Sequence, residues 1–181
     1  MSGPKPDRGW LMWLPLGLFI LLASAFVLGL RKPDDTSIAS KMVGARVPEF
    51  QLAPAAVGLP GLSGADLRTG TPHLVNFFAS WCVPCVAEAP QIEAIARQGV
   101  PIVGIAVRDR PQDVAAFLAR HGSPYVKVGS DTASWTQIAF GSSGVPETFL
   151  VDGQGVIRMQ KIGPINPDDV AAVVVAVRKA G

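Results

Sequence analysis

A long run of apolar residues near the amino terminus is the first pattern along the chain. From Trp10 to Leu30, 21 residues carry no charge, and basic side chains flank the run at Lys5, Arg8, Arg31 and Lys32. A helix of that length, rising about 1.5 Å per residue, is roughly as long as the hydrocarbon core of a bilayer is thick. The pattern predicts a short tail over residues 1–9 and a single transmembrane anchor over residues 10–30.

A cleaved signal peptide is the alternative interpretation of this segment. Ala23-Ser24-Ala25 matches a small-residue cleavage site behind a basic start. The apolar run continues past this site through Phe26 to Leu30, which favours an anchor that is not cleaved. The two flanks carry similar positive charge, so the positive-inside rule favours a cytoplasmic amino terminus only weakly.

Beyond a polar linker over residues 31–45, strand-like and helix-like patterns alternate in one domain over residues 46–181. Predicted strands occupy residues 47–52, 73–79, 101–107, 125–128, 147–151 and 156–162. Predicted helices occupy residues 82–97, 111–120, 134–140 and 167–180, the last with Asn166 as its N-cap. The sequence Asp152-Gly153-Gln154-Gly155 is typical of a hairpin turn. This order predicts an α/β domain with a mixed central sheet and helices on both faces.

Composition and charge exclude several classes of protein. Hydrophobic residues make up 49% of the 181 residues and charged residues 17%, which excludes a disordered chain. Two cysteines are too few for a disulfide-dense scaffold or a four-cysteine zinc site. The net charge of +2 comes from the amino terminus, because 12 basic and 13 acidic residues follow from Pro33 onward. We therefore expect no nucleic-acid partner.

The candidate chemistry lies in Trp81-Cys82-Val83-Pro84-Cys85, between a predicted buried strand and a predicted helix. A C-x-x-C pair in this position is typical of a redox motif. Unpaired backbone N–H groups and the helix dipole at a helix start favour the thiolate of Cys82, which is the nucleophile in thiol–disulfide exchange. Two intervening residues place Cys85 one turn further on, close enough to displace a mixed disulfide.

Two other interpretations of the cysteine pair remain open. A static disulfide would close a loop too short to stabilise the fold much. A pair of thiolates is also a ligand set for Cu(I), but the only histidines, His73 and His121, do not cluster with the cysteines in the sequence. We expect ordinary core or surface roles for both histidines, no cofactor and no metal site.

Three segments together resemble a known family. Phe77 to Cys85 (FFASWCVPC) resembles the active-site segment of the thioredoxin superfamily. Gly144 to Asp152 (GVPETFLVD) and Val47 to Leu52 (VPEFQL) are similar to the membrane-anchored cytochrome c maturation thioredoxins, the CcmG/DsbE family. The resemblance covers almost the whole chain and implies a thioredoxin-like fold behind a single amino-terminal transmembrane helix.

The resemblance also implies roles for individual residues. Cys82 would attack the substrate disulfide and Cys85 would resolve the mixed disulfide, so that the pair forms the redox disulfide. Pro146 would be a cis-proline that faces the cysteines, and we expect it to bind the substrate chain together with Trp81 and Val145. Asn76 stands where thioredoxin has a buried aspartate, so we expect Glu88 and Glu147 to tune the thiols instead. Thr148, Phe149, Val151 and Ile105 are interpreted as strand or core residues.

The function implied is thiol–disulfide exchange at a bacterial inner membrane. The resemblance predicts a single-pass protein whose carboxy-terminal domain lies in the periplasm and reduces apocytochrome c, or a haem-assembly protein that carries it. A membrane thiol reductase would restore the dithiol, since reduction in an oxidising compartment needs its own electron supply.

Two alternatives to this function remain open. The nearer is a thiol reductase for the copper-site cysteines of a respiratory oxidase, which differs only in its substrate. The more distant is a non-enzymatic module that delivers Cu(I) through the thiolate pair.

Overall fold

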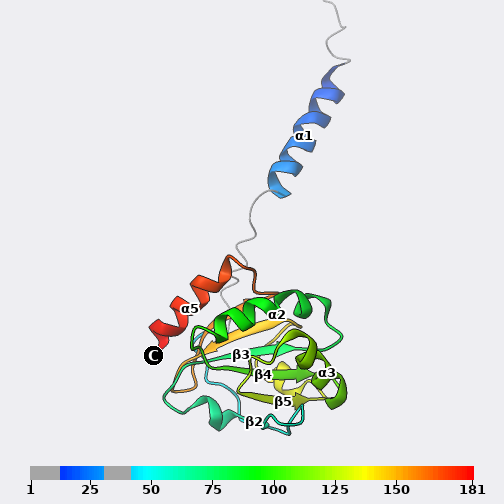
Figure 1. Cartoon of the computed structure of the whole chain (residues 1–181). Coiled ribbons are helices and arrows are strands. Elements are labelled where there is room, and N and C mark those ends of the chain that lie inside the picture. Colours follow the sequence, from blue (N-terminus) through cyan, green and yellow to red (C-terminus); the bar gives the residue numbers. More distant parts are fainter. Residues whose placement is uncertain (1–12, 31–41) are drawn as a thin grey trace, which may run out of the picture. The chain divides into compact units, whose positions relative to one another are not determined.

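The computed structural model describes residues 13–30 and 42–181, which belong to two separate units (Figure 1). The first contains helix α1, Leu14–Leu30. Across the described ranges, none of the helices reaches the length and apolarity that a membrane crossing requires. The tail at 1–9, residues 10–12 of the predicted anchor and residues 31–41 of the predicted linker lie outside the described residues.

A five-stranded mixed sheet forms the centre of the second unit. Its strands stand in the order β5-β4-β3-β6-β7. Strands β3, β4 and β5 are parallel, β6 runs antiparallel to β3, and β7 runs antiparallel to β6. The bounds are β3 His73–Phe78, β4 Ile102–Val107, β5 Lys127–Asp131, β6 Glu147–Val151 and β7 Ile157–Ile162. The mixed sheet confirms the predicted fold class for this part of the chain.

Two predicted strands differ from the structure. Only Gln51–Leu52 (β1) of the segment 47–52 is a strand, and it pairs with β2, Leu62–Ser63, in a separate small sheet. The segment before it is held elsewhere, because the Val47 N–H donates to the Gly155 carbonyl. Strand β5 begins two residues later than predicted and continues through Gly129, which looks like a turn residue in the sequence. A Cβ at Gly129 would lie 2.8 Å from Leu52, so this glycine permits the close approach of β1.

The helices of the second unit are α2 Val83–Ala96, α3 Pro111–His121, α4 Trp135–Ala139 and α5 Asp169–Ala180, with the 3₁₀ helix η2 Gly64–Leu67 before β3. The expected N-cap of the last helix is wrong. The Asn166 carbonyl accepts the Asp169 N–H at 3.0 Å and so closes a turn before the helix. The helix itself starts at Asp169, with Asp168 as its N-cap. The other predicted helix ends agree with the structure to within about two residues, which is the usual uncertainty of such boundaries.

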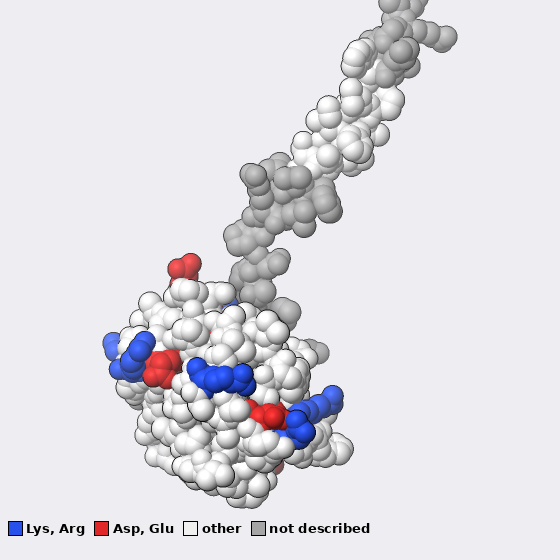
Figure 2. All heavy atoms as spheres, turned by 45° about the vertical axis from the view of Figure 1, so that its right-hand side comes forward, with Lys and Arg blue, Asp and Glu red and all other residues white. Residues whose placement is uncertain are grey.

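The two faces of the sheet carry different cores. Side chains alternate along β3 and β4, so that Leu74, Phe78, Ile102 and Ala106 face a core shared with α2, α3 and α5. Val75, Phe77, Val103 and Ile105 face a second core with Leu62, Leu67 and Phe140. Asn76 interrupts the first face with a buried amide. On the outside, Figure 2 shows basic and acidic side chains lying beside one another, with no large field of a single sign on that face.

Candidate active site

The two cysteines lie where β3 ends and α2 begins. Cys82 is the N-cap residue of α2 and is joined to Cys85 by a disulfide with a Cα–Cα distance of 5.2 Å. The Cys85 backbone N–H donates to the Cys82 Sγ at 3.2 Å. Cys82 is 4% exposed and Cys85 2%. An N–H group aimed at one sulfur at a helix start stabilises negative charge there, which is what the attacking thiolate of an exchange reaction needs.

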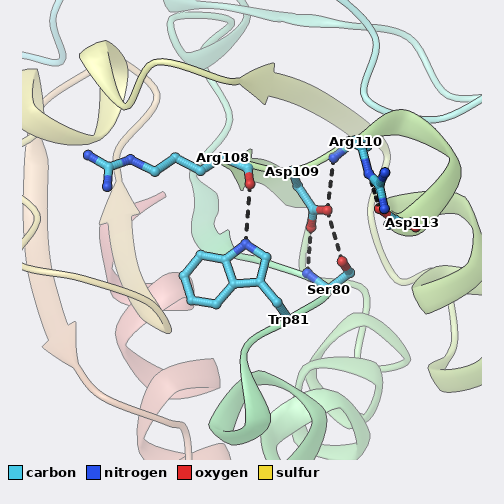
Figure 3. Close-up of polar contacts among 6 residues, drawn as sticks. All are labelled: Ser80, Trp81, Arg108, Asp109, Arg110 and Asp113. Atoms are coloured by element: carbon cyan, nitrogen blue, oxygen red, sulfur yellow. Dashed lines mark hydrogen bonds and ion pairs between the residues drawn. The ribbon is translucent and has the colours of Figure 1, made fainter.

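The loop before Cys82 is tied to the loop after β4 (Figure 3). The Asp109 carboxylate accepts hydrogen bonds from the Ser80 N–H at 2.5 Å, the Ser80 hydroxyl at 2.8 Å and the Arg110 N–H at 2.9 Å. The Trp81 indole N–H donates to the Arg108 carbonyl at 3.3 Å, while the ring remains 59% exposed. These contacts hold an exposed aromatic ring next to the redox pair.

Arg108 has an unusual backbone in this arrangement. Its φ is +49°, in the left-handed region that side chains other than glycine rarely adopt. Its N–H donates to the Asp131 carbonyl at 3.1 Å, and its guanidinium Nε donates to the Ser134 hydroxyl at 2.8 Å. These contacts maintain the conformation that turns the Arg108 carbonyl toward Trp81.

Pro146 reaches the cysteine end of β3 through strand pairing. Glu147, the first residue of β6, pairs with Phe77 near the end of β3. The preceding Val145–Pro146 peptide bond is cis, as the family resemblance implies for this proline. Pro146 is buried and Val145 half-buried. Antiparallel pairing of β6 with β3 thus brings this segment to the end of the sheet that carries the cysteines.

Glu88 is buried inside a polar network. Its carboxylate accepts hydrogen bonds from the Asn76 amide and the Ile165 N–H, each at 3.0 Å, and it is 2% exposed. Burial raises the pKa of Glu88 to about 7, although both hydrogen bonds favour the charged form. Such a carboxyl exchanges a proton near neutral pH. Glu88 lies one turn after Cys85 on α2, where the two side chains are neighbours.

Glu147 is fully buried and holds a loop. Its carboxylate accepts hydrogen bonds from the Ser142 hydroxyl at 2.8 Å and the Ser143 N–H at 2.9 Å, and Gln160 donates to its other oxygen. These partners fix the segment that leads to Val145 and Pro146. Among the described residues, neither Glu88 nor Glu147 has a hydrogen bond to a cysteine sulfur.

Sequence reasoning did not identify Thr148, Tyr125 or Asp109 as residues of the site. The Asn76 amide also donates to the Thr148 hydroxyl and accepts from the Tyr125 hydroxyl, at 3.0 and 2.8 Å. Asp109 holds the Ser80 loop. Thr148 was interpreted only as a strand residue, although Asn76 and Thr148 are both polar positions in buried strands. That polarity is the signal that sequence reasoning could have used, and Tyr125 and Asp109 give no comparable signal.

His73 lies at the start of β3 and His121 at the end of α3, and both are half-buried. Burial lowers the pKa of His73, and the ring of His121 packs against Phe117 with centroids 5.0 Å apart. Within residues 13–30 and 42–181, no three His, Cys, Asp or Glu side chains are grouped closely enough to hold a metal ion.

Comparisons with known proteins find relatives whose names agree with a redox role for this cysteine pair. The Redoxin family model matches residues 42–175. The thiol:disulfide interchange protein HelX of Rhodobacter capsulatus is 37% identical over 158 residues, which are 87% of this chain and 89% of HelX. DsbE of Yersinia pestis is 37% identical over 169 residues, 90% of this chain and 89% of DsbE. A crystal structure assigned as DsbE from Chlorobium tepidum has a TM-score of 0.66 at 26% identity, and the match covers 76% of this chain and 96% of that one.

Proposed function

The chain belongs to the Redoxin family and, within it, to the DsbE/CcmG/HelX thiol:disulfide interchange proteins, and we propose that it reduces a disulfide of apocytochrome c, or of a haem-assembly protein that carries it, during c-type cytochrome biogenesis. Its activity is thiol–disulfide exchange through Cys82 and Cys85. The observation that carries the proposal is the cysteine pair at the start of α2, with the Cys85 N–H directed at the Cys82 sulfur.

In the proposed cycle the Cys82 thiolate attacks one sulfur of the substrate disulfide. A Cys82–substrate disulfide forms, and the other substrate sulfur leaves as a thiolate that takes a proton from water. Cys85 then loses its proton, attacks the Cys82 sulfur and releases the second substrate thiolate. The protein ends with the Cys82–Cys85 disulfide, and the substrate with two thiols that are free to attach haem.

We assign Glu88 as the acceptor of the Cys85 proton. Asn76 cannot accept a proton, and a carboxyl whose pKa is about 7 changes its protonation state near neutral pH. Glu147 acts differently in this proposal: its contacts with Ser142 and Ser143 hold the loop before Pro146 in place. Pro146 and Val145 then bind the substrate chain beside the cysteines, and the exposed Trp81 ring contacts it as well.

The proposed location determines what the reductive direction of exchange requires. Residues 10–30 form an anchor in the bacterial inner membrane, residues 31–45 a tether, and residues 46–181 a domain in the periplasm. The uncharged run over residues 10–30 supports this arrangement. Reduction in an oxidising compartment requires a membrane thiol reductase that returns two electrons to the Cys82–Cys85 disulfide. Anchoring raises the effective concentration of substrate and reductase in the same membrane.

A covalent trap tests the proposed substrate. Cys85→Ser in the full-length protein leaves Cys82 able to attack but removes the thiol that resolves the mixed disulfide, so the substrate stays attached to Cys82. We expect a reductant-sensitive adduct with an apocytochrome c or a haem-assembly protein in membranes. The matched Cys82→Ser variant should give no such adduct. Capture of a copper-site subunit of an oxidase instead would refute the proposed substrate while leaving the exchange chemistry intact.

A further inference from the structure

The Asn76 side chain lies at the centre of a buried chain of hydrogen bonds. On one side the Tyr125 hydroxyl donates to Asn76 Oδ1 at 2.8 Å. On the other side Asn76 Nδ2 donates to Glu88 Oε1 and to the Thr148 hydroxyl, each at 3.0 Å. Asn76 is completely buried, so no solvent can replace any of these partners. The Tyr125 hydroxyl is therefore connected to the Glu88 carboxylate through a single amide.

The chemistry of the three groups gives this chain a direction. An ionised carboxylate can only accept hydrogen bonds, so it requires the NH₂ end of the Asn76 amide. That orientation turns Asn76 Oδ1 toward Tyr125, where it needs a donor, and the phenol supplies one. The two dipoles then point their positive ends toward the Glu88 charge, and each hydrogen bond strengthens the other.

We propose that Tyr125 is a positioning residue for the exchange reaction, whose hydroxyl holds the Asn76 amide in the orientation that stabilises the charged form of Glu88. The proposal rests on the proposed role of Glu88 as acceptor of the Cys85 proton. Tyr125 itself touches neither substrate nor sulfur in this scheme. It acts by keeping Glu88 able to take a proton near neutral pH.

The fold makes specific room for this tyrosine. The Tyr125 ring stacks on Phe78, with centroids 5.0 Å apart and planes 11° from parallel. It lies over Gly104 of β4, the residue that pairs with Asn76 in the sheet. A Cβ at Gly104 would lie 3.2 Å from the Tyr125 ring and 2.8 Å from Phe78. The missing side chain at Gly104 thus lets the phenol reach across β4 to the amide on β3.

Tyr125 remains a donor throughout the working pH range. Burial, together with the charge of Glu88, raises the pKa of Tyr125 well above its ordinary value. The groups that contact Glu88 or its amide partner are Asn76 from β3, Thr148 from β6, the Ile165 N–H after β7, and Tyr125. Tyr125 is the one of these groups that can ionise, and its raised pKa keeps it protonated. In the reduced protein Cys85, one turn before Glu88 on α2, is a further titratable side chain. A change in pH therefore acts on this network through Glu88 and Cys85.

Tyr125→Phe removes one oxygen atom and tests the proposal directly. Reduced full-length protein is mixed with oxidised glutathione, and formation of the Cys82–Cys85 disulfide is followed by tryptophan fluorescence across a pH series. Loss of one hydrogen bond that favours the charged carboxyl corresponds to about a three- to tenfold smaller acid dissociation constant for Glu88. We expect the Glu88 inflection in the rate profile to move upward by about half to one pH unit.

Thr148→Val is the matched control, because it removes the other buried hydroxyl bonded to the same amide. The Thr148 hydroxyl accepts one N–H of Asn76 Nδ2 while the other N–H serves Glu88, so its loss removes no donor that is directed at the Glu88 charge. Its loss should leave the inflection in place or move it downward. Upward shifts of equal size in both variants would mean a general disturbance of packing, and would overturn the positioning role.

Glu88→Gln separates this inference from the proposed role of Glu88. If Tyr125 acts through Glu88, Tyr125→Phe should change nothing further in the pH profile of the Glu88→Gln protein. An unchanged profile in Glu88→Gln alone would refute the role of Glu88. A profile that responds to Glu88→Gln but not to Tyr125→Phe would refute the inference about Tyr125 only. If exchange is too slow to follow, infrared titration of the Glu88 carboxyl in oxidised wild-type and Tyr125→Phe protein measures the same shift directly.

Discussion

The buried carboxyl of Glu88 should make the stability of the oxidised protein depend on pH. Its pKa is about 7 in the folded protein, against 4.5 for an ordinary glutamate, which represents the unfolded chain. A carboxyl with a raised pKa contributes stability fully below the unfolded pKa and loses it as pH rises through the folded pKa. At about 1.4 kcal/mol per pKa unit, the contribution of Glu88 falls by about 3 kcal/mol between pH 4 and pH 8.5.

Glu88→Gln isolates this contribution, because glutamine cannot ionise. The free energy of unfolding is measured by urea titration of wild type and variant at about pH 4 and pH 8.5, with the disulfide intact so that no thiol titrates. The gap between the two proteins should move in favour of the variant by about 3 kcal/mol at the higher pH. All other carboxylates are common to both proteins and cancel in the comparison.

A control and a contradicting result complete this test. Val86→Ala lies on the exposed side of the same helix and removes no titratable group, so its gap to wild type should be the same at both pH values. A gap between Glu88→Gln and wild type that also stays constant would refute the reasoning. It would mean that Glu88 has the same pKa in the folded and in the unfolded protein, so that its burial has no net effect on its ionisation.

Two further predictions concern the residues that support the site. Gly104→Ala places a methyl group 2.8 Å from Phe78 and 3.2 Å from Tyr125, so we expect urea unfolding to show a loss of about 1–3 kcal/mol. Gly144→Ala, where a Cβ meets nothing within 4 Å, is its control, and equal stability of the two variants would contradict the close packing. Asp109→Ala removes the acceptor for two Ser80 donors and the Arg110 N–H, so we expect a loss of about 1–3 kcal/mol and a changed Trp81 fluorescence. Asp109→Asn should be less destabilising, because its carbonyl oxygen can still accept from Ser80. An Asp109→Ala protein with wild-type stability and fluorescence would show that the Ser80 loop keeps its conformation without Asp109.

Local patterns predicted most of the secondary structure correctly. Strands β3 and β4 are nearly continuous apolar runs because both of their faces are buried, and α3 has the spacing of a helix with one buried face. The errors in the strands occurred where a distant segment decides the conformation. Val47 bonds to the Gly155 loop, and Gly129 continues a strand because Leu52 packs against it. Neither partner is visible from the segment itself.

The site likewise has features that local sequence predicts and features that distant segments decide. The Cys82–Cys85 pair at a helix start is a local feature, because helix geometry alone places two residues with this spacing one turn apart. The burial of Glu88 is a different matter, because a glutamate three residues after a cysteine could equally face solvent. Its partners Asn76 and Ile165 are 12 and 77 positions away in the chain.

The sequence by itself determined the kind of chemistry, the family and the elements that carry the cysteines. Those properties depend on residue spacing, side-chain type and hydrophobic period, which act over a few neighbouring positions. Only the tertiary structure decided which groups surround the pair. Pairing of β6 with β3 brings Pro146 to the cysteine end of the sheet. The absence of a side chain at Gly104 leaves room for Tyr125 to reach Asn76. A buried polar group must find its partner wherever the fold places one, and that position is a property of the packed chain as a whole.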